Sequence, residues 1–306
     1  MITSLFRKST PLNYSLVVIL LLFCFFMYQF QDSNLAIALS LKMVILAVLL
    51  GLLFVVNFIV KKNGLTKNSS YTILFYLLLL LFFPSIFSDF KLLLANFFLM
   101  MAMRRLISLQ SLKLPKEKIF DASLWIFVAS LFHFWCILFI LLVFISIIFH
   151  VSRDYRNWLL PFVAFFAIAI ISVLAAMVFD ITWISNFIEQ SKTNFQLDYF
   201  TNNFQNIALS VYVVTALYFV FSMIFSVSNK PLILQASFKK MIFTFFIGIV
   251  VFLISPEKNS TILVFTFMPL SVMATSNIEY SQSKMYQEIV LALFIILAFF
   301  CFFSQL

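Results

Sequence analysis

The fold is decided by residues 119–150 in the middle of the chain, IFDASLWIFVASLFHFWCILFILLVFISIIFH. Between Asp121 and His150 this stretch contains no Asp, Glu, Lys or Arg. As a single α-helix it would be about 48 Å long, which is too long for an upright helix in a hydrocarbon core about 30 Å thick. As two antiparallel segments, 120–133 and 134–150, each would be about 20–25 Å long. The choice decides on which side of a membrane every later loop lies.

The distribution of Lys and Arg favours two segments. Membrane proteins concentrate these residues in their cytoplasmic loops. Two segments put sixteen of them on one side and three on the other, whereas a single segment would give twelve and seven. The cytoplasmic set would be Arg7, Lys8, Lys61, Lys62, Lys67, Arg104, Arg105, Lys113, Lys116, Lys118, Arg153, Arg156, Lys230, Lys239, Lys240 and Lys284. Lys91, Lys192 and Lys258 would lie outside. We therefore predict a cytoplasmic N-terminus and an external C-terminus.

The composition excludes a soluble protein. Of 306 residues, 64% are hydrophobic and 10% are charged, and the mean hydropathy is +1.12. An ordinary soluble domain is about half apolar and about a quarter charged. Disorder, a soluble enzyme and a nucleic-acid binder are thereby excluded in spite of the net charge of +9. We predict an all-α, polytopic transmembrane helix bundle that forms a single integral membrane domain over 1–306, without a soluble domain.

We predict about eleven spans, including short paired hairpins. Their ranges are 15–31, 35–60, 71–86, 90–104, 120–133, 134–150, 157–179, 206–227, 240–254, 260–276 and 286–304. The first resembles a signal peptide, but no small-residue cleavage site follows it, so we expect it to remain. Pro84 disfavours helix at Phe83, so the third and fourth spans should form a tight hairpin with an external tip. Cys24, Cys136 and Cys301 lie in apolar runs and should be buried and inert.

The longest external loop, from Asp180 to Asn206, interleaves aromatic with polar residues. That mixture suits the headgroup layer of a membrane. The loop is either a connector that lies along the membrane or a lid over an external site.

Motifs of soluble enzymes are missing, and three glycines in the whole chain cannot build a phosphate-binding loop. We predict no cofactor and no metal site. Asp32 and Asp89 follow spans on the predicted external face, where a carboxylate could act as a general base; alternatively, they simply occupy wet turns. Lys42, inside an apolar run, either reaches the interface, pairs with one of these carboxylates or binds a lipid phosphate, and Lys91 is a second candidate for contact with a phosphate.

Other polar residues have less specific interpretations. His133 lies at the tip of the 120–150 hairpin, either as a hydrogen-bonded interfacial residue or as part of an external site. Arg104, Arg105, Arg153 and Arg156 should contact lipid headgroups or an anionic partner on the cytoplasmic side. The isolated residues Asn57, Asn96, Ser222 and Thr275 should form hydrogen bonds between helices.

Two resemblances to known families add to these expectations. The segments SLFRKSTPLNYSLVVILLLFCFFMYQF, FDASLWIFVASLFHFWCILFILL and RDYRNWLLPF resemble an uncharacterised family of Bacteroidota (flavobacterial) inner-membrane proteins, domain of unknown function 6427. This resemblance covers nearly the whole chain. It implies a multi-pass protein of the bacterial inner membrane and supplies no activity.

The second resemblance concerns architecture. The segments SDFKLLLANFFLMMAMRRL and KEKIFDASLWIFVASLFHFWCILFILLVFISIIFH resemble the middle of multi-span (GT-C) glycosyltransferases that use polyprenyl-phosphate sugars. In such enzymes the first external loop carries an acidic general base. The resemblance implies that Asp32 is the base, that Asp89 is a second acid near the acceptor and that Lys42 or Lys91 contacts phosphate.

Three hypotheses for the function therefore stand. The protein is an enzyme of cell-envelope biogenesis that transfers a sugar from a lipid-phosphate donor, a transporter or flippase for a lipid or small solute, or a non-catalytic membrane subunit of an envelope complex. Its expected partners are the bilayer, a polyprenyl-phosphate-linked sugar or other lipid, and membrane proteins. The first hypothesis needs an external carboxylate and an external cation in one cavity.

Overall fold

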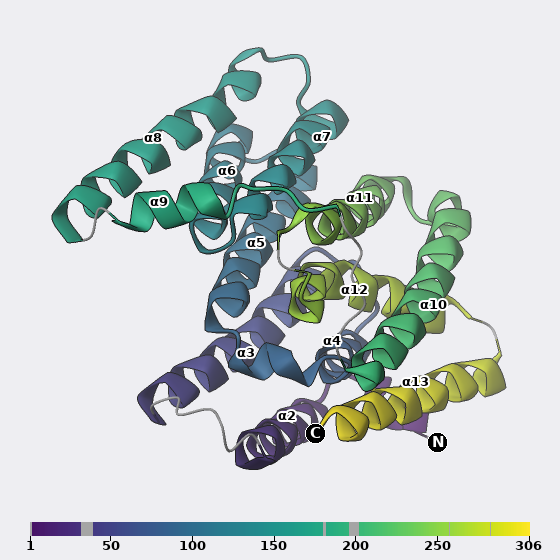
Figure 1. Cartoon of the computed structure of the whole chain (residues 1–306). Helices are drawn as coiled ribbons and strands as arrows, with labels where there is room; N and C mark the ends of the chain where they lie inside the picture. Colours follow the sequence, from purple (N-terminus) through teal and green to yellow (C-terminus); the bar gives the residue numbers. More distant parts are fainter. Residues whose placement is uncertain (1, 32–38, 180–181, 196–201, 257, 282) are drawn as a thin grey trace.

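The computed structural model describes residues 2–31, 39–179, 182–195, 202–256, 258–281 and 283–306. Every regular element within these ranges is a helix (Figure 1). The α-helices are α1 (Ile2–Phe6), α2 (Pro11–Gln31), α3 (Leu39–Lys62), α4 (Tyr71–Leu81), α5 (Phe90–Ser108), α6 (Pro115–Phe132), α7 (Ile140–His150), α8 (Arg156–Phe179), α9 (Thr182–Glu189), α10 (Asn203–Ser226), α11 (Leu232–Ile254), α12 (Val264–Tyr280) and α13 (Lys284–Gln305). Short 3-10 helices are η1 (Pro84–Ser88), η2 (Leu109–Ser111), η3 (Phe134–Phe139), η4 (Val227–Asn229) and η5 (Ser260–Leu263).

Each of the eleven predicted spans coincides with a helix. Among the described residues, eight helices are long and apolar enough to cross a membrane. Two shorter apolar helices, Tyr71–Leu81 and Phe134–His150, accompany them, and α6 begins with charged residues. The chain is thus all-helical with multi-pass character, and the count of eleven complete crossings stays a prediction.

The central stretch folds as two segments. Helix α6 ends at Phe132, and His133 takes an extended conformation with φ −144° and ψ 107°. The chain then reverses through η3, and α7 returns beside α6 (Figure 1). The break that the charge distribution favoured at 133–134 is therefore confirmed.

The core is built around α4 and α12. All eleven residues of α4 are buried. Phe75 of this helix and Phe82, its C-cap, pack on Phe294 of α13, with ring centres 5.2 and 5.5 Å apart. Phe83 stacks on Phe267 of α12. Burial on all sides explains why α4 can be as short as it is, because neighbouring helices rather than lipid surround it.

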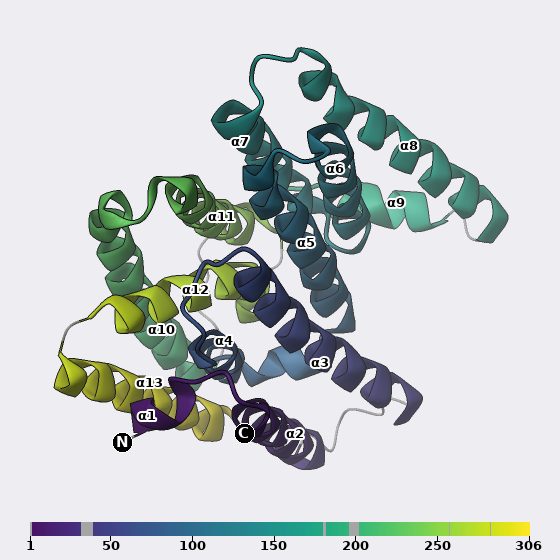
Figure 2. The ribbon, with the colours of Figure 1, turned by 180° about the vertical axis from the view of Figure 1, so that it is seen from behind.

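Helices α5 to α8 extend from this core as a second group (Figure 2). Phe98 of α5 stacks on Trp125 and Phe132 of α6, with ring centres 5.5 and 5.7 Å apart. Helix α8 packs on α6 but is largely exposed, because only 17% of the residues in its apolar stretch are buried. An apolar helix with so little protein contact is suited to a lipid environment.

The helix connections that the structure describes gather at two opposite ends of the bundle (Figure 1). We call one end the basic end, because it carries the connections with most of the Lys and Arg residues. There the Ser70 N–H donates to the Phe6 carbonyl (3.0 Å), and Arg105 forms an ion pair with Asp121 (2.7 Å). At the Asp89 end, the Gln305 side chain donates to the Phe82 carbonyl (2.8 Å). Each of these pairs joins segments that the charge count assigns to the same side of the membrane.

Polar residues inside the predicted spans mostly link helices. The Asn96 side chain donates to the Tyr76 hydroxyl (3.0 Å), and Asn57 accepts from the Tyr14 hydroxyl (3.4 Å). Ser222 accepts from the Asn277 side chain (2.5 Å). Thr275 differs, because its hydroxyl donates to the Ser271 carbonyl of its own helix (2.8 Å).

The three cysteines are free and buried, as their apolar surroundings predicted.

Candidate functional site

The start of α5 fixes Asp89 and Lys91 at one end of the bundle. Pro84 cannot continue α4, which ends at Leu81, and the chain turns through η1. Asp89 is the N-cap of α5, and its Oδ1 accepts a hydrogen bond from the Leu92 N–H (3.1 Å). A carboxylate at this position also interacts favourably with the positive end of the helix dipole. Asp89 is therefore held by backbone structure, with Lys91 in the first turn of the same helix.

His133 lies across from this helix start, in the turn between α6 and η3 and outside the spanning helices. Its Nε2 is 3.1 Å from the hydroxyl of Ser255, and its ring packs on Phe265 with centres 5.6 Å apart. Burial lowers the pKa of His133 from 6.5 to about 4. The imidazole is consequently neutral at neutral pH, and Ser255 fixes its orientation.

The third wall comes from the connection between α11 and η5. The Lys258 ammonium group donates to the Asn194 carbonyl (2.6 Å), and the Asn194 N–H donates to the Ile254 carbonyl (3.3 Å). These bonds tie the segment after α9 to the end of α11. Phe187 of α9 also packs on Phe134, with ring centres 5.2 Å apart. The loop predicted as either a connector or a lid thus contains a helix that contacts the segment after His133, and the choice between the two stays a prediction.

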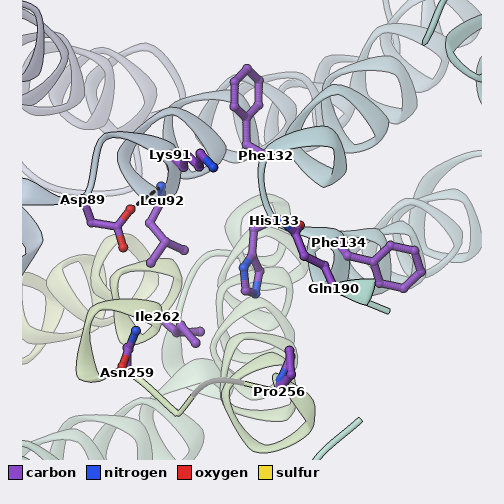
Figure 3. Close-up of a pocket in the computed structure, with 10 residues that line it drawn as sticks. All are labelled: Asp89, Lys91, Leu92, Phe132, His133, Phe134, Gln190, Pro256, Asn259 and Ile262. Atoms are coloured by element: carbon purple, nitrogen blue, oxygen red, sulfur yellow. Dashed lines mark hydrogen bonds between the residues drawn. The ribbon is translucent and has the colours of Figure 1, made fainter. Parts of the chain in front are cut away.

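These three walls enclose an open cavity of about 260 Å³ (Figure 3). Asp89 and Lys91 border it on one side, His133 and Gln190 on another, and Asn259 on the third. The sequence-predicted external residues Asp89, Lys91 and His133 are thus brought together from distant segments. The apolar part of the lining comes from Leu92, Phe132, Phe134, Pro256 and Ile262.

A second hollow of about 410 Å³ adjoins the first, because Asp89 and Asn259 line both. Ser85 and Thr261 also line it, and their hydroxyl oxygens are buried without a hydrogen-bond partner among the described residues. Buried polar groups are nearly always paired. Unpaired hydroxyl groups beside a carboxylate indicate a place where a polar ligand or ordered water completes the hydrogen bonding.

The remaining sequence-predicted residues are elsewhere. Asp32 lies outside the described residues, so its distance from Asp89 stays untested. Lys42 is half-buried in the first turn of α3, does not line either hollow and forms no ion pair with a described residue. Its pairing with Asp89 is not observed.

The predicted arginines lie at the basic end. Arg105 pairs with Asp121, and the Arg104 guanidinium lies 4.8 Å from the centre of the Phe58 ring. Arg153 is exposed, and Arg156 lies 5.9 Å from the centre of the Tyr155 ring. Two of them therefore have clear packing roles, and contact with headgroups stays a prediction for all four.

Sequence reasoning missed Gln190, Gln205, Asn259 and Thr261. Each lies in a polar turn or at a helix start, where such residues are expected without any function. Nothing in their spacing shows that these turns converge on Asp89, because the convergence arises from the packing of α5, α11 and α12.

The cavity offers hydrogen-bond acceptors, amide groups and one ammonium group, and the adjoining hollow adds hydroxyl groups. This set can bind a hydroxylated molecule that carries negative charge, and the Asp89 carboxylate can accept a proton. Among the described residues no group of three His, Cys, Asp or Glu side chains could hold a metal ion.

Comparison with known families identifies the chain as a whole. A family profile, described as a family of unknown function (DUF6427), matches residues 1–306. The chain belongs to DUF6427. No curated protein and no solved structure matches it. Membership in DUF6427 thus extends over the cavity and both ends of the bundle, and it brings no activity with it.

Proposed function

We propose that this DUF6427 protein binds a lipid-phosphate sugar at the Asp89 end and transfers the sugar, as a step in cell-envelope biogenesis. The observation that carries the proposal is the convergence of Asp89, Lys91 and His133 on one cavity, with the unpaired hydroxyls of Ser85 and Thr261 beside it. A carboxylate and a cation in a shared cavity are the minimum that such a transfer requires.

In the proposed step, the Asp89 carboxylate takes the proton from an acceptor hydroxyl group while the acceptor oxygen forms a bond to the anomeric carbon of the sugar. The bond between that carbon and the lipid-phosphate oxygen breaks, and the electron pair leaves with the phosphate. Lys91 stabilises the negative charge on the departing phosphate. Hydroxyl and amide groups of the adjoining hollow hold the sugar.

Two alternatives are less well supported. A non-catalytic subunit predicts a bundle without a pocket, whereas two hollows adjoin Asp89. A transporter or flippase predicts a polar tunnel that contains Lys42, Asn57 and Asn96. Asn57 is instead bonded to α2 and Asn96 to α4, in separate helix pairs.

The test is an envelope glycan profile of a deletion strain complemented with variants. Asp89→Asn is the decisive variant, because asparagine remains a good N-cap but cannot take a proton. Asp154→Asn is the matched control, since it makes the same change in an exposed ion pair with Lys116 at the basic end. We expect deletion and Asp89→Asn to lose the same glycan, and Asp154→Asn to restore it.

Unchanged glycans in the deletion strain would refute the transferase. Full restoration by Asp89→Asn would remove Asp89 as the base. In either case the next experiment is to isolate the partners of a membrane subunit.

We also propose that the protein lies in the inner membrane with the basic end in the cytoplasm and the Asp89 end outside. The support is the concentration of Lys and Arg at the basic end. Single cysteines at Lys192 and Lys113, both exposed, provide the test, because the native cysteines are buried. In cells with a permeabilised outer membrane, an impermeant maleimide should label the cysteine at 192 and not the one at 113. The reverse pattern would overturn this orientation.

A further inference from the structure

A further polar cavity, of about 310 Å³, lies at the basic end of the bundle, away from the two hollows beside Asp89. It is formed by the residues after α1, the connection between α3 and α4, and the connection between α12 and α13. Three cations line it: Arg7, Lys67 and Lys284. The cavity is separate from the Asp89 site, so a ligand bound there is independent of the proposed sugar transfer.

The one carboxylate in this lining is occupied by the structure itself. Glu279 Oε1 accepts a hydrogen bond from the Ser69 hydroxyl (2.6 Å), and Oε2 accepts one from the Lys67 N–H (2.8 Å). The Lys67 ammonium group donates to the Glu279 carbonyl (3.1 Å) and lies 4.8 Å from the centre of the Tyr280 ring. Glu279 therefore holds the α3–α4 connection in place and partly balances the charges of Lys67 and Lys230.

Arg7 and Lys284 keep their charge available to the cavity. Neither side chain forms a hydrogen bond or ion pair with a residue that the structure describes. Both side chains are exposed and line a hollow whose one carboxylate, Glu279, is already hydrogen-bonded to Ser69 and Lys67, so both would attract an anion in the hollow. The arrangement indicates an anionic ligand.

The wall that carries Arg7 is fixed. The Tyr71 hydroxyl donates to the Thr3 carbonyl (2.5 Å), and the Thr3 hydroxyl donates to Glu288 of α13 (3.4 Å). Figure 2 shows α1 lying against α13 as a result. Arg7 follows directly on α1, so this packing brings it to the same cavity as Lys284.

The depth of the cavity indicates what the anion is. Helices α4 and α13 begin at residues that line it, Tyr71 and Lys284. The ends of membrane-spanning helices lie at the level of the lipid phosphates. The first turn of α13 also carries an exposed apolar side chain, Met285, which directly follows the cavity residue Lys284. A ligand with a phosphate group and acyl chains fits both surfaces.

We propose that this cavity binds a phosphate group between Arg7 and Lys284, supplied by an anionic phospholipid. Basic pockets between membrane helices are suited to such headgroups. The lipid joins the start of the chain to α13 and so holds α1 against the bundle.

Lipid binding to the full chain, purified in detergent and freed of lipid, tests this. Phosphatidylglycerol and phosphatidylcholine are titrated separately and followed by native mass spectrometry. We expect one phosphatidylglycerol to bind in preference to phosphatidylcholine. Replacing two cations near the membrane surface, as in Arg7→Gln with Lys284→Gln, should weaken that binding about thirty-fold.

The matched control is Lys113→Gln with Lys239→Gln, which removes two exposed charges from the same end but outside the cavity. It should bind phosphatidylglycerol as the wild type does. The single variants Arg7→Gln and Lys284→Gln should each show part of the loss, which keeps the test valid if the double variant fails to fold. Equal binding by the cavity and control variants would overturn the proposal.

A competition arm distinguishes the two sources of the phosphate group. Displacement of phosphatidylglycerol by millimolar sodium phosphate would assign the site to free phosphate and overturn the phospholipid as its occupant. No displacement, together with loss in the cavity variants, would assign the site to the phospholipid.

Discussion

The substitution Gly248→Ala tests how closely α11 and α12 pack in the core. A Cβ atom added at Gly248 would lie 2.7 Å from Thr266 Cγ2 and 3.5 Å from backbone atoms of Phe265 and Thr266. Thr266 is fully buried, and its hydroxyl group is bonded to the Leu263 carbonyl and the Tyr212 hydroxyl. Its methyl group can turn aside only by breaking these bonds.

Two opposing effects set the expected magnitude. Alanine is favoured over glycine within a helix by about 1 kcal/mol. Overpacking of a closely packed core costs about 1–3 kcal/mol, and the fixed position of Thr266 puts this site in the upper part of that range. We therefore expect Gly248→Ala to lower the free energy of unfolding by about 1–2 kcal/mol.

Gly51 of α3 is the matched control. A Cβ there would meet only Phe97 Cε2, at 3.6 Å, which is an ordinary van der Waals distance. Gly51→Ala should therefore raise the stability by up to about 1 kcal/mol. Adding Thr266→Ser to Gly248→Ala removes the clashing methyl group while keeping the hydroxyl group, and it should recover part of the loss.

A thiol-reactive fluorophore measures these changes, since all three cysteines are buried and react only when the helices separate. Each kcal/mol should shift the midpoint of thermal unfolding by about 2–4 °C. If Gly248→Ala unfolds at or above the wild-type temperature, as Gly51→Ala should, the reasoning from the α11–α12 contact is refuted.

Thermal unfolding checks three further predictions, with circular dichroism in place of the fluorophore for the pH series because thiols react poorly below neutral pH. Asp89→Ala should cost about 1 kcal/mol through loss of the α5 N-cap and Asp89→Asn should cost little, so equal losses would argue against the capping role. Because burial lowers the pKa of His133 to about 4, the unfolded chain takes up a proton that the folded chain does not, and stability should fall as the pH drops from 6.5 towards 4. His133→Gln should flatten that fall, and an unchanged profile would contradict it. Lys240 is fully buried and donates to the Leu106 carbonyl (2.5 Å), so Lys240→Met should cost about 1–3 kcal/mol while exposed Lys239→Met should be neutral.

Part of the candidate site could be derived from the sequence. Asp89 and Lys91 follow a proline that ends a span, and His133 lies where a long apolar stretch must reverse. Charge counting puts all three residues at one end of the bundle. The packing of α5 against α11 and α12 decides that they share one cavity. The same packing brings Asn259 to this cavity and Thr261 to the hollow beside it.

The cavity at the basic end shows more clearly how much of a site depends on the tertiary structure rather than on the sequence. Arg7 and Lys284 are near opposite ends of the chain, and each alone is an ordinary positive charge beside a membrane span. Only the packing of α1 on α13 brings them together. Lys240 likewise has the sequence environment of a cytoplasmic cation, yet it is fully buried, with its ammonium group on a carbonyl of α5.

The sequence by itself determined the helical class, the positions of the eleven helical segments and the end of the bundle to which each connection belongs. These features are local, because a chain inside a bilayer must satisfy its backbone hydrogen bonds within each helix. The tertiary structure alone decided which helices are neighbours, which of their faces meet lipid and which polar residues converge. Lipid tails are as apolar as leucine side chains, so hydrophobicity does not distinguish a helix face that packs on protein from one that faces lipid.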